Sequence, residues 1–177
     1  MTIKNMLVPV GDIVRDEGAI GTALMLTQEF GGHADCIFVI GDVRDVIPAR
    51  AMGLFESVQF KIKKEYEQER DERQKTARRR FDKMLQERNI EYRELALPAE
   101  LPSASWEIAP GVASEIVAMR GGAYDMVVVG RPARDETTVA ELSAEAALFR
   151  TGRPVLIAPP TLPKATGEAV VIGWNRS

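Results

Sequence analysis

The sequence predicts an α/β fold built on a five-stranded parallel sheet with helices on both faces. Two observations lead to this prediction. Segment 123–160 has the pattern of a buried strand, a loop with Gly130, a helix and a second buried strand, which is a βαβ unit. In the rest of the chain, short apolar runs alternate with stretches of helical periodicity, as expected when helices cover a parallel sheet.

The strands are expected at five apolar runs, which lie at 3–10, 34–40, 90–97, 125–129 and 154–158. Pro9 fits the first run because a strand end can lose one ladder donor. The run at 90–97 alternates apolar and polar residues and is therefore expected at an edge of the sheet. Residues 98–105 are expected to form a loop.

The helices are expected where apolar residues recur at helical spacing, at 17–30, 58–88, 109–120 and between Gly130 and Pro154. Glycine pairs close the first and third of these helices. In the long helix the apolar stripe lapses over 67–76, so the central turns are expected to face water. Pairs such as Glu69 with Arg73 and Asp71 with Lys75 would support that part of the helix.

The composition fits one globular domain. The chain has 177 residues, of which 45% are hydrophobic and 28% charged, and its net charge is -3. The acidic balance provides no general attraction to nucleic acid, and acidic neighbours dilute the basic run 78–80, so no nucleic-acid partner is expected. No apolar run is long enough for a membrane span and no signal peptide is evident, which predicts a cytoplasmic protein without a membrane partner.

Cysteine and histidine are each present once. Cys36 lies inside an apolar run, where a buried, unreactive thiol is expected. His33 follows a glycine pair at the end of a helix, and a solvated position is expected for it. A histidine-rich metal site is excluded, and so is a catalytic triad that uses any other histidine. No metal ligands and no catalytic residues are therefore predicted.

A ligand crevice is expected at the carboxyl ends of the strands. Right-handed crossovers and a reversal of winding would bring segments 9–12 and 130–134 to one mouth between the first and fourth strands. A helix that begins after the loop offers free N–H groups to a phosphate, so a nucleotide is the first ligand to consider. The alternative is that Gly130 serves only to make the turn, since a lone glycine is a weak signal.

These segments resemble the universal stress protein family over the first 160 residues. NMLVPV is similar to the first strand of that family, AYDMVVVGRP to its fourth strand and loop, and LFRTGRPVLIAPP to the approach to its fifth strand. The resemblance implies a Rossmann-like domain with strand order 3-2-1-4-5, a dimer, a cytoplasmic location and a stress-related role. In one branch of the family it also implies ATP binding.

The ATP-binding branch has a loop of two glycines three positions apart and, after nine more residues, a glycine followed by serine or threonine. Here the spacing is kept, but only Gly130 matches; Ala133, Ser143 and Ala144 stand in the other places. The resemblance places the nucleotide-lining positions at Pro9, Val10, Val39, Val129 and Gly130. The acidic residue after the first strand is displaced, because Gly11 takes its place and Asp12 follows. Arg131 and Arg134 offer phosphate contacts.

The last residues predict a second structural unit. We expect a domain over 1–160, followed by a linker and an extra strand within 161–177. The apolar segment 169–174 resembles the first strand of a second tandem domain. An uncovered apolar strand tends to pair with a sheet edge, so we expect it beside the fifth strand, in the same chain or in a partner. A homodimer through the fifth-strand edge and this strand follows.

The function expected is that of a non-enzymatic, dimerising universal-stress-protein-like domain with a degenerate ATP site, in which magnesium accompanies the nucleotide. Two alternatives remain open. One is an enzyme that hydrolyses adenine nucleotides, although no set of side chains with assignable roles supports it. The other is an interaction scaffold whose working surface is the long charged helix 58–88, with a vestigial crevice.

Overall fold

Six parallel strands form one sheet, in the order β3-β4-β2-β1-β5-β6. The computed structural model describes residues 3–40, 56–95, 102–132, 138–162 and 170–173, and leaves aside the side chains of 56–60, 62, 63 and 66. The strands are β1 (Asn5–Val10), β2 (His33–Ile40), β3 (Glu91–Tyr92), β4 (Ser103–Pro110), β5 (Met126–Gly130) and β6 (Val155–Ala158).

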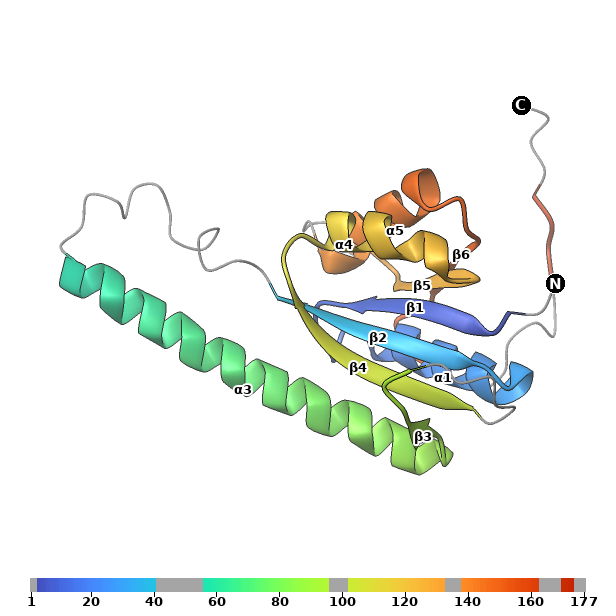
Figure 1. Cartoon of the computed structure of the whole chain (residues 1–177), viewed down its shortest axis with the longest axis horizontal. Helices are drawn as coiled ribbons and strands as arrows, with labels where there is room; N and C mark the ends of the chain where they lie inside the picture. The colour runs from blue at the N-terminus through green and yellow to red at the C-terminus, as the bar shows by residue number, and fades with distance from the viewer. Residues whose placement is uncertain (1–2, 41–55, 96–101, 133–137, 163–169, 174–177) are drawn as a thin grey trace.

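Helices cover both faces of the sheet (Figure 1). They are α1 (Glu17–Phe30), α3 (Glu56–Arg88), α4 (Ala113–Arg120) and α5 (Val139–Arg150), with the short 3-10 helix η2 (Gly121–Ala123) after α4. One buried cluster joins the sheet to α1 and to the second half of α3. A second cluster joins the opposite face to α4 and α5. Within the described residues, no helix is both long and apolar enough to cross a membrane.

The strands alternate their side chains between these two clusters, as the pleat requires. In β1, Met6 and Val8 face α1, whereas Leu7 faces the side of α4 and α5. In β5, Val128 takes the first side and Val127 and Val129 take the second. These strands are buried on both faces because they lie at the centre of the sheet, between β2 and β6.

The predicted fold class and parallel sheet are confirmed, and the order differs by one added edge strand. The third long strand was predicted at 90–97, and this position is wrong. This strand is β4, which begins inside the expected loop 98–105 and pairs with β2 over its whole length. Of the expected strand 90–97, only Glu91 and Tyr92 pair with β4. The serines of β4 concealed this strand, since they are buried by hydrogen bonding rather than by apolar packing.

Helix α4 begins four residues later than predicted. Ala109 and Pro110 complete β4 opposite Val39 and Ile40 of β2. Gly111 then turns the chain with a φ of 134°, in the range where glycine is favoured. The helix therefore starts at Ala113 instead of at residue 109.

The expected extra strand over 169–174 is not formed within the single chain. Residues 170–173, the part of it that the structure describes, lie in no strand, and Val171 is 96% exposed. After β6 the chain follows α1 instead of returning along the edge. Pro159 and Leu162 fill the space beside Gly18 and Gly21, where a side chain on either glycine would collide with them.

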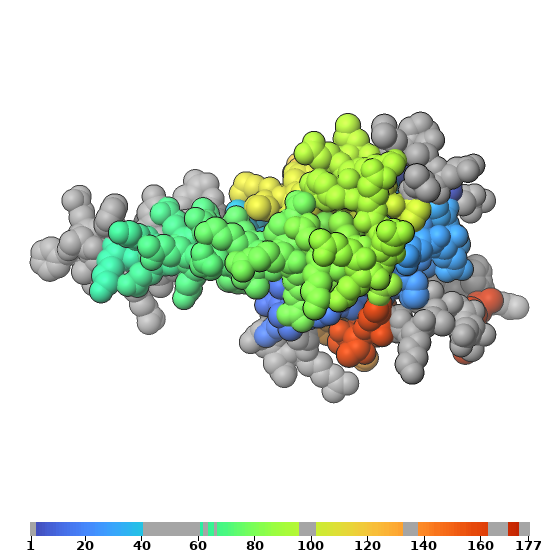
Figure 2. All heavy atoms as spheres, turned by 90° about the horizontal axis from the view of Figure 1, so that it is seen from below, coloured from blue at the N-terminus to red at the C-terminus, as the bar shows by residue number. Residues whose placement is uncertain are grey.

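Helix α3 has two different halves. The second half packs on the sheet through Ala77, Phe81, Met84 and Leu85. Figure 2 shows the first half extending beyond the body of the molecule as an arm. The apolar stripe of the second half is confirmed. The central turns are mostly exposed as predicted, although some of their side chains line a cavity.

Candidate functional site

Two adjoining cavities lie where the carboxyl ends of β1 and β2 meet α3. The larger has a volume of about 290 Å³ and the smaller of about 60 Å³. Gly11, Phe38 and Arg73 line both, so the two form one crevice. Carboxyl ends of parallel strands are where α/β proteins bind their ligands, which makes this crevice the candidate site.

Each wall of the crevice has its own chemistry. The end of β2 supplies an apolar wall of Phe38, Val39 and Ile40, and Phe38 stacks on Trp106 with ring centroids 5.5 Å apart. The loop after β1 supplies Gly11 and Asp12, and the Asp12 carboxylate accepts the N–H groups of Val14 at 2.8 Å and Arg15 at 3.1 Å. Helix α3 supplies the charged wall, made by Glu69, Arg70, Glu72 and Arg73 with Thr76 and Ala77.

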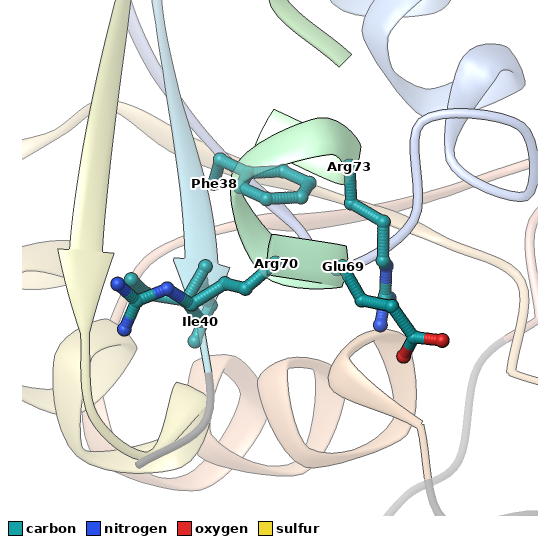
Figure 3. Close-up of a pocket in the computed structure, with 7 residues that line it drawn as sticks. Phe38, Ile40, Glu69, Arg70 and Arg73 are labelled. Carbon is teal, nitrogen blue, oxygen red and sulfur yellow. The ribbon is translucent and has the colours of Figure 1, made fainter. Parts of the chain in front are cut away.

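The close-up in Figure 3 shows how the charged wall is arranged. Arg70 reaches across the end of β2 beside Ile40, whereas Glu69 and Arg73 extend together on the other side of α3. No ion pair joins Glu69 to Arg73 in the part of the chain that the structure describes, so the expected pair is not formed. The expected pair of Asp71 with Lys75 is replaced by one between Lys75 and Glu72, at 3.0 Å.

The buried carboxylate of Asp16 binds the loop after β1 on the side that faces β5. Asp16 Oδ2 accepts the backbone N–H groups of Gly11 at 2.8 Å and Asp12 at 3.0 Å. Burial raises the pKa of Asp16, against the opposite effect of these two hydrogen bonds. A Cβ on Gly130 would lie 2.7 Å from Asp16 Oδ1. The carboxylate therefore occupies the space between the carboxyl ends of β1 and β5.

Val139, the first residue of α5, covers the same loop after β1. Thr138 caps the helix by accepting the N–H of Glu141 at 3.2 Å. The side chain of Val139 then packs against the loop after β1, where a Cβ on Gly11 would come within 2.5 Å of it. Gly11 is therefore required for the close approach of α5, whatever the ligand.

The predicted nucleotide-lining residues divide into two groups. Gly11, Asp12 and Val39 line the crevice, which lies between β1, β2 and α3 and not between the first and fourth strands as predicted. The others do not line it: they are Pro9, Val10 and Val129, buried in their strands; Gly130 beside Asp16; Ser143 and Ala144, buried in α5; and the exposed Arg131. Ala133 and Arg134 lie outside the described residues. The structure thus brings the predicted positions of β1 and β2 together in the crevice. It places Gly130, Ser143 and Ala144 elsewhere.

Sequence reasoning missed the contributions of Asp16, Phe38 and α3. Asp16 carried a weak signal, since it stands just before a helix, where a capping carboxylate is common. The arginines of α3 carried no signal, because Arg70 and Arg73 stand in a run of mixed charges. Only the direction of α3 across the sheet brings them to the crevice.

A second polar cluster lies on the opposite face of β2 and β4. His33 Nδ1 lies 2.8 Å from Ser103 Oγ and His33 Nε2 lies 3.0 Å from Asp35 Oδ1. Asp35 also accepts hydrogen bonds from Ser105 and Tyr124. His33 is only 3% exposed, so the expectation of a solvated histidine is wrong. It is the first residue of β2 and lies opposite Ser103 in the sheet register.

Asp35 is held in its ionised form. Burial acts to raise the pKa of Asp35, but the hydrogen bonds from His33 and Ser105 outweigh it, and the pKa is lowered. Asp35, Ser105 and Tyr124 line a cavity of about 390 Å³ beside the edge of the sheet. Because every polar atom of His33 is engaged, this cluster serves to hold β2 and β4 in register.

The crevice is suited to binding a planar, apolar group next to an anionic one. Its β2 wall is apolar and partly aromatic, Asp12 lies at the β1 end, and two guanidinium groups stand on α3. Among the described residues, no three His, Cys, Asp or Glu side chains are grouped so that they could hold a metal ion. Cys36 is buried on the α1 side, and burial strongly raises the pKa of its thiol.

Comparison with known proteins gives a likeness at the level of structure. No family model matches the sequence, and no curated protein matches it. Universal stress protein UspA from Lactobacillus plantarum superimposes with a TM-score of 0.61 at 14% identity, over 89% of this chain and 99% of that one. Hypothetical protein MJ0577 superimposes with a TM-score of 0.57 at 15% identity, over 90% of this chain and 97% of that one.

A protein of the universal stress protein family from Burkholderia pseudomallei gives a TM-score of 0.51 at 15% identity. It covers 89% of this chain and 96% of its own. The matches therefore extend over nearly the whole of these proteins. This chain has the fold of the universal stress proteins.

Proposed function

We propose that the chain is a universal-stress-protein-like domain that binds an adenine nucleotide, ATP with magnesium in the first place, in the crevice between β1, β2 and α3. The observation that carries the proposal is the cavity of about 290 Å³ at the carboxyl ends of β1 and β2. Together with the adjoining smaller cavity, it joins an apolar wall for a base to polar groups at Gly11 and Asp12, and Arg70 and Arg73 of α3 also line this crevice.

We also propose that the domain catalyses no reaction of its own, acts in the cytoplasm and forms a homodimer. In support of a binding role, the only histidine is engaged at both ring nitrogens, away from the crevice. Asp16 is already committed to two backbone N–H groups, so it is a poor general base. A test for phosphate release from Mg-ATP, at protein concentrations in excess of the ligand, should show no turnover.

Calorimetric titration with Mg-ATP tests the binding. Thr76 is exposed on α3 and lines the larger cavity, so Thr76→Trp should fill the crevice without disturbing the core. We expect the wild-type chain to bind and the variant to bind at least about tenfold more weakly. Lys83→Trp is the control, because Lys83 is exposed on the same helix but does not line the crevice. Absence of binding up to millimolar Mg-ATP in folded wild-type protein would refute the proposal.

A second candidate function rests on one observation, which is the arm formed by the first half of α3 (Figure 2). Lys61, Lys64 and Glu65 are exposed on it. A helix that extends beyond its own domain offers a surface to a partner protein, as the scaffold alternative requires. Charge reversal at Lys61 and Lys64 should abolish partner capture under this alternative and leave Mg-ATP titration unchanged. If the same variants weakened only nucleotide binding, the scaffold alternative would be excluded.

A further inference from the structure

The two arginines that α3 presents to the crevice have few partners of their own. Arg70 has a side chain only 32% exposed, and its Nε is buried without a hydrogen-bond partner in the described residues. The nearest carboxylate oxygen, on Asp71, lies 3.6 Å from the other end of the guanidinium. Arg73 forms no ion pair within the part of the chain that the structure describes. A buried N–H donor without an acceptor is costly, and an anionic ligand would satisfy it.

Both arginines also border the same crevice. They are three positions apart and so lie on one face of the helix. Both line the smaller cavity, and Arg73 lines the larger one as well. Figure 3 shows that Arg70 extends beside Ile40, whereas Arg73 extends beside Glu69. Each guanidinium group offers several N–H donors that suit phosphate oxygens.

The opposite side of the crevice is unsuited to phosphate. The carboxylate of Asp16 lies between Gly11 and Gly130 and already accepts the N–H groups of Gly11 and Asp12. Val139 packs over the same loop at the start of α5. A phosphate there would meet a carboxylate at short range and would compete for donors that are already used.

We infer that the phosphate groups of the bound nucleotide point toward α3, where Arg70 and Arg73 hold them, and away from the loop after β5. This inference rests on the proposed function, because it takes the ligand of the crevice to be an adenine nucleotide. The base then packs on the apolar wall at Phe38 and Val39. Glu69 lowers the positive charge beside Arg73 and limits the affinity for phosphate.

Titration with ADP and with adenosine, in parallel, separates phosphate contacts from base contacts. Arg73→Gln and Arg70→Gln should each weaken ADP binding, and the double variant should weaken it by at least about tenfold, with adenosine affinity unchanged. Glu69→Gln should strengthen ADP binding severalfold, because it removes a repulsive charge. Arg79→Gln is the matched control, since Arg79 is exposed on the same helix and lines neither cavity.

Wild-type affinity for ADP in the Arg70→Gln and Arg73→Gln variants would overturn the inference and leave the proposed function standing. An equal loss of adenosine and ADP binding would overturn it too, since the arginines would then act on the crevice as a whole. If the wild-type chain binds neither ligand, both the inference and the proposed function fail. Arg73 is exposed, so the single Arg73→Gln variant keeps the test valid even if Arg70→Gln impairs folding.

Discussion

Asp16 connects the carboxyl ends of β1 and β5. Its carboxylate accepts two N–H groups from the loop after β1, and its other oxygen faces the backbone of Gly130. Gly130 is therefore more than a turn residue: a side chain at this position would displace the carboxylate. Asp16 is 114 residues earlier in the chain, which is why no local pattern around Gly130 could reveal the contact.

Gly130→Ala should destabilise the fold by about 1–3 kcal/mol, because its Cβ would overlap Asp16 Oδ1 at 2.7 Å. In an Asp16→Ala background the same change should cost much less, since the overlapping atoms are gone. Urea unfolding of the four proteins measures the coupling. Gly122→Ala is the control, because a Cβ there would meet its nearest neighbour at an ordinary 3.8 Å. Additive effects of the two substitutions would contradict the contact.

The hydrogen bonds on Asp35 predict a dependence of stability on pH. The pKa of Asp35 in the folded state is lower than in the unfolded state, so the unfolded state binds its proton first as the pH falls. The stabilisation is complete above the ordinary aspartate pKa of about 4 and is lost below it, as the pH falls through the lowered value.

Asp35→Asn removes the titrating group and nearly preserves the shape of the side chain. The wild type should be more stable than this variant at neutral pH, and the difference should shrink below a pH of about 4. Denaturant unfolding at a series of pH values measures it. Asp16 changes stability in the opposite direction, since burial raises its pKa, and it is unaltered in both proteins. A difference that stays constant from neutral to acid pH would show that Asp35 acts only by packing.

At the scale of the element, only the second half of α3 should contribute to the stability of the fold, because that half packs on the sheet. Phe81 is fully buried and its ring lies 4.9 Å from that of Trp106. Phe81→Ala should therefore cost about 3–5 kcal/mol, as expected for loss of a buried aromatic side chain. Lys64→Ala, in the exposed arm, should change stability by less than about 0.5 kcal/mol. Thermal unfolding followed by circular dichroism compares them, and similar losses would mean that the arm also packs on the body.

The elements differ in how far the sequence could predict them. β1, β2 and β5 were predictable because each contains a run of buried apolar residues, and α1 and α5 because of their helical periodicity. β4 was not, since Ser103 and Ser105 are buried through hydrogen bonds to His33 and Asp35. A strand that buries serines has the sequence pattern of a loop until its partner strand is known.

The candidate site shows the same limit. Gly11 and Asp12 were predictable because carboxyl ends of parallel strands meet at one edge, and Val39 was predicted from the resemblance to the universal stress protein family. Arg70 and Arg73 were not, since the crossing of α3 over the sheet depends on packing at Ala77 and Phe81. The pattern of a helix gives its faces but not the strand ends that each face meets.

At the scale of the whole molecule, the β6 edge is where a second copy should bind. β6 is the last strand of the sheet, and the described residues 170–173 leave it uncovered. Ile157 of β6 is 52% exposed, and Phe149, in the last turn of α5, is 81% exposed. Exposed apolar side chains beside an unpaired strand favour association through that strand.

Ile157→Glu should convert a homodimer into a monomer, because a charge at this edge would be buried against the partner. Sedimentation velocity at micromolar concentrations measures the change. Met119→Glu is the control, since Met119 is also an apolar residue and is even more exposed, but lies on α4. Removal of residues 163–177 should weaken the dimer if the C-terminal segment takes part in it. A wild-type chain that sediments as a monomer, or an Ile157→Glu variant that remains dimeric, would show that the β6 edge is not the interface.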